Sequence, residues 1–211
     1  MKRPFARQAL PEDYRLSRRL DLIKDRKLLI TLSLASLIVF VVSWIGLSLL
    51  LITVRPNLAA DSMTFSVTAG GLGAIFLSLL VLLGVVFAMV TLHEAIHGLF
   101  FRLFTGGRVS YAFKGAYAYA AAPDWFIRNT AYRVISLAPL VLITVFGFIG
   151  LLLAPAGWIF PLLLLVTMNA AGAVGDVYVF FLLARLPGDV LVRDFGEQME
   201  IYTRQTEKTS P

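Results

Sequence analysis

The chain of 211 residues contains no cysteine and only two histidines. Without cysteine there are no disulfide bonds and no thiolate metal sites, so any metal must be held by His, Asp or Glu. Charged residues are also scarce, at 15% of the chain, whereas 58% of the residues are hydrophobic. Soluble domains are nearer half apolar and a quarter charged. The composition therefore excludes an ordinary soluble domain and indicates a membrane protein.

The basic residues are unevenly placed along the chain. Although the net charge is +6, nine of the nineteen Lys and Arg residues fall within the first 27 residues, directly before a long apolar run. This placement is typical of membrane topology, and we expect no nucleic-acid partner. The apolar run is far longer than the roughly 7–15 residues of a signal-peptide core, so we expect it to be a retained anchor.

Long apolar segments define the expected architecture. About 20 apolar residues are needed to cross the hydrocarbon core of a bilayer. Four segments meet this requirement: 28–54, 72–104, 130–154 and 158–186. The sequence thus predicts an all-α membrane protein with a four-helix domain over residues 28–186. A basic N-terminal segment (1–27) precedes this domain and a tail (187–211) follows it.

The connecting segments differ in charge. Residues 102–129 carry four basic residues and the chain from Arg185 onward carries four more, whereas the other two connections share only Arg55. Cytoplasmic loops carry an excess of Lys and Arg. We therefore expect both termini and the loop between helices two and three to be cytoplasmic, in an integral, multi-pass membrane protein.

That middle loop has aromatic residues at alternate positions. Tyr111 and Phe113 precede a Lys-Gly break, and Tyr117 and Tyr119 follow it. A period of two predicts a short β-hairpin. One interpretation is an interfacial loop whose tyrosines lie among lipid headgroups. Another is a hairpin whose edge strand pairs with an extended substrate.

Both histidines belong to one motif, His93-Glu94-Ala95-Ile96-His97. On a helix, residues four apart lie on the same face one turn apart, so both imidazoles can reach one metal ion. Glu94 then stands beside the metal, where it can take a proton from a metal-activated water and pass it to a leaving amine. Separate structural roles would explain each residue but not their spacing. Zinc is the expected ion, although imidazole also suits iron, nickel and copper.

Catalytic zinc usually has three protein ligands. With both histidines used, the third must be a carboxylate, and within the apolar segments only Asp176 remains. His93 and Asp176 each lie nine residues before an arginine, Arg102 and Arg185, and so at a similar depth of about 13 Å. The alternatives are an interhelical ion pair for Asp176 and, as a fallback ligand, Asp124.

Small residues surround Asp176. Asn169 begins the run Asn-Ala-Ala-Gly-Ala-Val-Gly and lies two helical turns before Asp176 on the same face. Asn169 can orient a metal ligand or bind a substrate backbone; alternatively, it joins helices and the glycines serve packing. Pro139 and Pro161 are expected to kink the third and fourth helices.

The motif His93 to Gly98, the pair Ala122-Pro123, and the segment from Asn169 to Asp176 resemble a small family of zincin membrane peptidases. In pattern this family is related to the site-2 protease type of intramembrane metalloprotease. That type usually has a proline between the Asn and the Asp, which this chain lacks. The resemblance implies zinc bound by His93, His97 and Asp176, with Glu94 as the catalytic acid and base.

The expected function follows from this likeness. We expect a zinc metalloprotease that cleaves a peptide or membrane-protein substrate within or beside the bilayer, with its active site near the cytoplasmic face. The alternative is a protein that binds, senses or transports a divalent metal through the same His and Asp residues without proteolysis. The sequence favours the protease, because no relay of polar residues leads from the site to the outer face.

Overall fold

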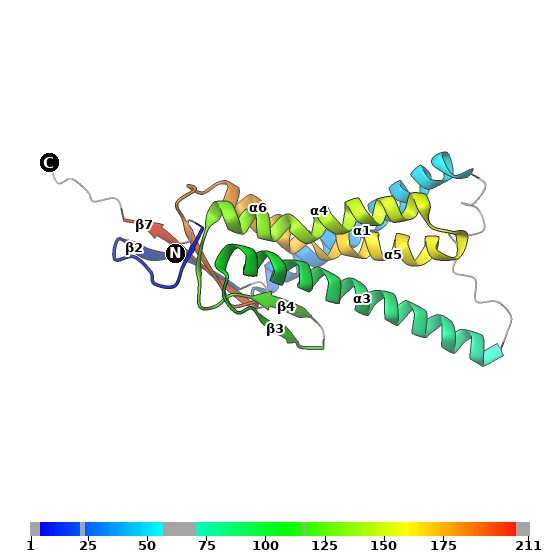
Figure 1. The fold of residues 1–211 in the computed structure, drawn as a ribbon, viewed down its shortest axis with the longest axis horizontal. Coiled ribbons are helices and arrows are strands. Elements are labelled where there is room, and N and C mark those ends of the chain that lie inside the picture. The colour runs from blue at the N-terminus through cyan, green and yellow to red at the C-terminus, as the bar shows by residue number, and fades with distance from the viewer. Residues whose placement is uncertain (1–4, 22–23, 57–70, 116, 206–211) are drawn as a thin grey trace. The chain divides into compact units, whose positions relative to one another are not determined.

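The computed structural model describes residues 5–21, 24–56, 71–115 and 117–205 (Figure 1). In chain order its elements are β1 (Ala6–Arg7), β2 (Tyr14–Asp21), α1 (Arg26–Val54), α3 (Gly71–Thr105), β3 (Ser110–Phe113), β4 (Ala118–Ala121), β5 (Phe126–Arg128), α4 (Asn129–Leu153), α5 (Ala156–Gly172), α6 (Val174–Ala184), β6 (Leu191–Asp194) and β7 (Gln198–Arg204).

Four segments are long and apolar enough to cross a membrane, as the apolar runs predict. Helices α1, α3 and α4 begin and end within two residues of the predicted limits. Capping fixes the start of α1, because the Leu28 N–H donates to Asp25 Oδ1 at 3.0 Å. An aspartate before the first helical turn satisfies amides that the helix itself leaves unpaired.

The fourth segment differs from its prediction, because a break divides it into α5 and α6. The last helical bond of α5 joins the Ala173 N–H to the Asn169 carbonyl at 2.9 Å. Gly172 has a low helix propensity and no side chain to pack, which permits the break. As a result Asp176 lies in the first turn of α6, where the helix dipole favours a carboxylate.

A five-stranded antiparallel sheet shows that the all-α prediction is wrong. Its strand order is β1-β5-β6-β7-β2, so both terminal segments contribute strands beside the short strand that precedes α4. β2 pairs with β7 from Tyr14↔Arg204 to Asp21↔Gln198. Both terminal segments and the segment before α4 therefore meet in one sheet.

Strand β7 is buried on both faces, which anchors the sheet. Met199 and Ile201 belong to one hydrophobic cluster, together with Leu20 of β2. Tyr202 faces the other way and packs edge-on against Phe126, with ring centroids 5.2 Å apart. Burial of apolar area on two faces stabilises strands that are individually short.

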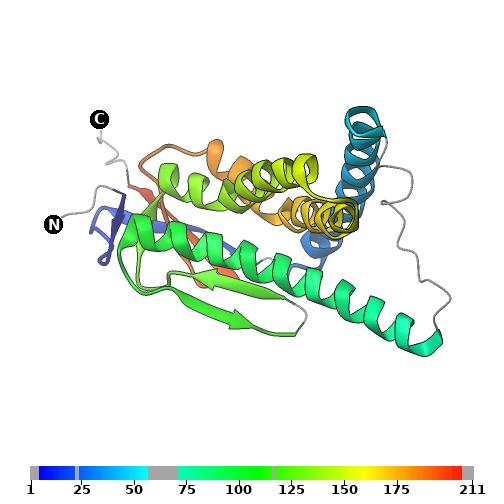
Figure 2. The same ribbon diagram turned by 45° about the vertical axis from the view of Figure 1, so that its right-hand side comes forward.

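The predicted hairpin is confirmed, because β3 pairs with β4 from Ser110↔Ala121 to Phe113↔Ala118. It lies along the C-terminal part of α3 (Figure 2). Gly98 of α3 makes this approach possible, since an added Cβ would lie only 1.8 Å from Tyr111 Oη. The residue that directly follows the His-Glu motif thus accommodates a tyrosine of the hairpin.

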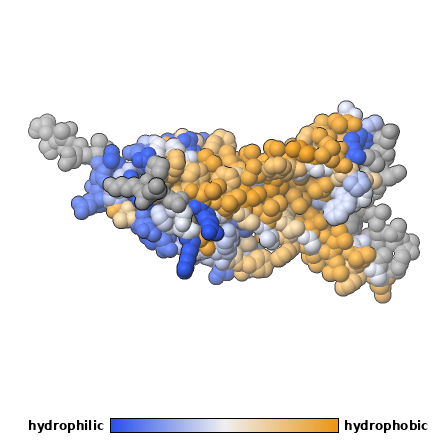
Figure 3. Space-filling model, in the orientation of Figure 1, coloured by the Kyte–Doolittle hydropathy of each residue, from blue (hydrophilic) through white to orange (hydrophobic). Residues whose placement is uncertain are grey.

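The described residues form two compact units. One comprises residues of 1–31, 94–138 and 175–211 and contains both sheets, with Phe101, Ile135 and Leu183 in its core. The other comprises residues of 32–93 and 139–174 and is helical, with a core that includes Leu51, Leu151 and Leu163. Apolar residues cover the helices and hydrophilic residues gather over the strands of the larger sheet (Figure 3).

Candidate metal centre

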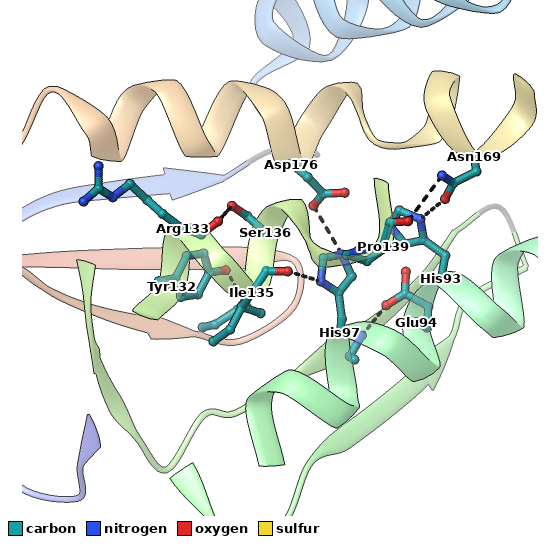
Figure 4. Close-up of polar contacts among 12 residues, drawn as sticks. His93, Glu94, His97, Tyr132, Arg133, Ile135, Ser136, Pro139, Asn169 and Asp176 are labelled. Atoms are coloured by element: carbon teal, nitrogen blue, oxygen red, sulfur yellow. Dashed lines mark hydrogen bonds and ion pairs between the residues drawn. The ribbon is translucent and has the colours of Figure 1, made fainter. Parts of the chain in front are cut away.

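Three predicted ligands come together in the structure. His93 and His97 lie one turn apart on α3, and Asp176 projects from α6 (Figure 4). Each offers one ligand atom, and these atoms all lie within 4.8 Å of one another. Both histidines are buried and the aspartate is half-buried. Spacing of four residues on a helix, together with the first turn of α6, produces this convergence.

Asn169 lies beside His93 and not beside Asp176. Its side-chain oxygen is 2.9 Å from His93 Nδ1, and its amide nitrogen donates to the Pro139 carbonyl at 3.4 Å. The amide oxygen can only accept, so Nδ1 of His93 is the donor, and in the neutral imidazole the lone pair is then on Nε2. Asn169 is completely buried in α5. This is the arrangement expected of a residue that orients a metal-binding histidine.

A backbone carbonyl, in place of a side chain, orients the ring of His97. Its Nδ1 lies 3.1 Å from the Ile135 carbonyl of α4. In a regular helix that carbonyl would accept the amide of the residue four positions later, but that residue is Pro139, which has no N–H. Pro139 therefore leaves the Ile135 carbonyl available to His97, and in the neutral imidazole the lone pair is then on Nε2.

His97 Nε2 is 3.4 Å from Asp176 Oδ1. This separation suits either an ion pair or two ligands of one cation. The third donor, on His93, favours the second interpretation, because a simple ion pair requires only two groups.

Glu94, the residue between the histidines, points toward the hairpin. Its Oε2 accepts a hydrogen bond from the Ala120 N–H of β4 at 2.7 Å. This bond fixes the carboxylate beside the three candidate ligands (Figure 4). By contrast, Asp124, the fallback ligand, is exposed in the turn before β5 and is not a member of the group.

The donor set fits a divalent metal. Two imidazoles and one carboxylate form a set known from catalytic zinc sites. Both histidines have Nδ1 engaged by an oxygen acceptor, so both can present Nε2 to the ion. The chemistry and preorganisation of these groups therefore suit a metal ion, with zinc the natural occupant.

Two groups at the site could not be identified from the sequence, namely the Ile135 carbonyl and the Ala120 N–H. Both belong to the backbone, so residue type does not reveal them. A signal for the carbonyl did exist, because a proline inside a helix frees the carbonyl four residues before it. No comparable signal pointed to the amide.

Comparison with known families identifies one match. A family model described as "Putative zincin peptidase" matches residues 86–191, about half of the chain. The matched region includes the His-Glu motif, the hairpin, Asn169 and Asp176. Comparisons with curated proteins and with solved structures gave no match.

Proposed function

The chain belongs to the family described as "Putative zincin peptidase", and from this premise we propose that it is a zinc-dependent endopeptidase that cleaves within or beside a membrane. The match confirms the resemblance drawn from residues 93–98 and 169–176. The observation that carries the proposal is the convergence of His93, His97 and Asp176 on one point. Two of these residues lie in a helix apolar and long enough to span a bilayer.

His93, His97 and Asp176 would hold the zinc ion, and Asn169 and the Ile135 carbonyl would orient the two imidazoles. When bound, zinc supplies a Lewis acid that makes water nucleophilic near neutral pH. Glu94 accepts a proton from the attacking water and returns it to the nitrogen of the leaving amine. The hydrogen bond from Ala120 supports this role by holding the carboxylate in place.

The outer edge of β4 suits an extended peptide. In the described part of the chain β4 pairs only with β3, and the Ala120 N–H points to Glu94 instead of β3. Backbone groups alternate along a strand, so those of Ala118 share this outer edge. A peptide that pairs with this edge would pass beside Glu94, as β-augmentation elsewhere places a ligand along a sheet.

The distribution of basic residues supports a cytoplasmic site. Of the nineteen Lys and Arg residues, all but Arg55 fall in the unit that contains both sheets. Glu94, His97 and Asp176 belong to this same unit. By the positive-inside bias this unit faces the cytoplasm.

The test uses purified protein in liposomes with membrane proteins that each have a single span. New N-termini would be identified by mass spectrometry, with Glu94→Gln as the matched variant. We expect wild type to generate new N-termini and Glu94→Gln to lose at least about 100-fold in rate, since general acid-base catalysis contributes that much or more. Elemental analysis would show zinc in both proteins and its loss in His93→Ala.

Equal cleavage by wild type and Glu94→Gln, with zinc retained, would refute the proposal. Stoichiometric metal without any cleavage would favour the metal-sensing or metal-transport alternative. Absence of stoichiometric metal from wild type under non-chelating conditions would refute both.

A further inference from the structure

The turn between β6 and β7, residues 194–197, contacts the hairpin that borders the candidate site. Tyr117, just before β4, donates from its hydroxyl to Glu197 Oε1 at 2.8 Å. Tyr119 of β4 packs on Gly196, where an added Cβ would lie 2.1 Å from the ring. Two side chains from one segment thus meet two consecutive residues of the turn.

The turn is itself held firmly. Gly196 adopts φ of 87°, a conformation that favours glycine, and its N–H donates to Asp194 Oδ1 at 2.6 Å. The other oxygen of Asp194 accepts a hydrogen bond from Tyr132 of α4. Asp194 is buried, and burial raises its pKa despite these hydrogen bonds. The turn is therefore fixed to α4, a helix that also orients His97 through Ile135.

Apart from its contacts with this turn, the hairpin is held through Ala120, which is buried in the hydrophobic cluster of the same unit and bonded to Glu94. Its two strands pair only with each other in the described part of the chain, and isolated two-stranded hairpins are marginally stable. Both Tyr111 and Phe113 are more than half exposed. Gly98 of α3 accommodates Tyr111 of β3, and the β6–β7 turn binds the β4 side of the hairpin through Glu197.

We propose that the β6–β7 turn orders β4 against Glu94, with Glu197 and Tyr117 as positioning residues for peptide binding. This inference rests on the proposed function, since it assigns a role in presenting the β4 edge to substrate. Glu197 and β7 lie outside the region that the family model matches. The five-stranded sheet would thus act in peptide binding, although none of the three candidate metal ligands lies on it.

The Tyr117–Glu197 hydrogen bond favours an ordered hairpin over a loosened one, and the two forms are in equilibrium. If the ordered hairpin binds peptide and a loosened one does not, the apparent KM rises as the ordered fraction falls. A single hydrogen bond is worth about 1 kcal/mol, or roughly fivefold in the opening equilibrium. We expect zinc affinity to stay unchanged, because the hydrogen bonds that orient His93 and His97 come from Asn169 and the Ile135 carbonyl.

The test compares Tyr117→Phe with Tyr202→Phe. Tyr202 also donates its hydroxyl to a glutamate, Glu200 of β7 at 2.6 Å, but it packs in a hydrophobic cluster that includes no hairpin residue. Hydrogen exchange of the Ala120 amide would be measured in each protein with zinc bound. KM and kcat would be measured on the peptide that wild type cleaves fastest.

Exchange at Ala120 should accelerate up to about fivefold in Tyr117→Phe and KM should rise, with kcat, zinc content and thermal stability close to those of wild type. Tyr202→Phe should leave exchange at Ala120 and KM unchanged. Glu197→Ala should reproduce Tyr117→Phe, whereas Glu197→Gln, which keeps an acceptor oxygen, should restore wild-type behaviour.

Unchanged exchange at Ala120, or equal acceleration in Tyr202→Phe, would overturn the inference. Faster exchange with unchanged KM would also overturn it, because the contact would then be structural only. A wild-type protein without peptidase activity would instead refute the proposed function. The two failures are therefore distinguishable.

Discussion

Pro139→Ala should weaken metal binding without weakening the fold. Pro139 has no N–H, so the Ile135 carbonyl lacks its helical donor and accepts from His97 Nδ1 at 3.1 Å. Alanine restores an N–H at the position that bonds this carbonyl in a regular helix. The carbonyl is then drawn into the helix of α4, and His97 loses the partner that fixes its ring and tautomer.

The magnitude follows from what such partners contribute. Removing a group that orients a metal ligand typically costs 10–100-fold in metal affinity, or about 1.4–2.7 kcal/mol. Helix stability should move the other way, since a proline inside a helix is about 3 kcal/mol less favourable than alanine. Neighbouring groups reduce this difference in membrane helices. We therefore expect weaker zinc binding together with equal or higher thermal stability.

Zinc affinity would be measured by competition with a chromophoric chelator in detergent, and stability by thermal unfolding of the metal-free protein. Pro161→Ala is the matched control, because Pro161 also lies inside a helix, α5, and frees the carbonyl of Gly157 instead. Equal zinc affinity in the two variants would show that the freed carbonyl does not position His97. A large loss of stability in Pro139→Ala would contradict the same reasoning.

Two further predictions concern the hairpin and the sheet. Gly98→Ala should displace Tyr111 and lower peptidase activity with zinc retained, since the added Cβ would lie 1.8 Å from Tyr111 Oη. Gly84→Ala, in the same helix with open space around it, should leave activity unchanged; similar losses in both variants would contradict the assignment. Burial acts to raise the pKa of Glu200, but hydrogen bonds from Tyr202 and Arg19 outweigh it and hold that pKa below its ordinary value of 4.5. Glu200 therefore adds stability above pH 4.5 that is lost as the pH falls through its lowered pKa. Glu200→Gln should be about 1 kcal/mol less stable at pH 7, and the difference should shrink in acid; thermal unfolding between pH 2 and 7 would refute this if the difference stays constant.

The long apolar helices could be predicted from sequence because their signal is local. About 20 consecutive apolar residues suffice to identify a span, and the predicted limits of α1, α3 and α4 agree closely with the structure. The break before Asp176 was harder to foresee, since the apolar run continues through it. Gly172 marked the position, but small residues also occur in unbroken membrane helices.

The sheet could not be predicted because its pairs are remote in sequence. β2 carries several arginines and pairs with β7, whose partner residues lie up to 190 positions away, from Tyr14 to Arg204. The alternation of Met199 and Ile201 is a strand signal for β7, but the strand is too short for the signal to be distinctive.

For the metal site, the spacing of the histidines and the exclusion of other carboxylates predict the three ligands. The contact of Asn169 with His93 could not be predicted in this way, because it depends on how α5 packs.

The pairing of β2 with β7 also fixes the order of assembly during synthesis. Strand β2 cannot pair with β7 until β7 has been synthesised, after all four apolar segments. Pairing between such distant residues is slow, because a long loop must close before any contact forms. The β6–β7 turn, which lies directly before β7, also forms only at this stage. A nascent chain would thus have its candidate metal ligands before the β6–β7 turn can hold the β4 edge.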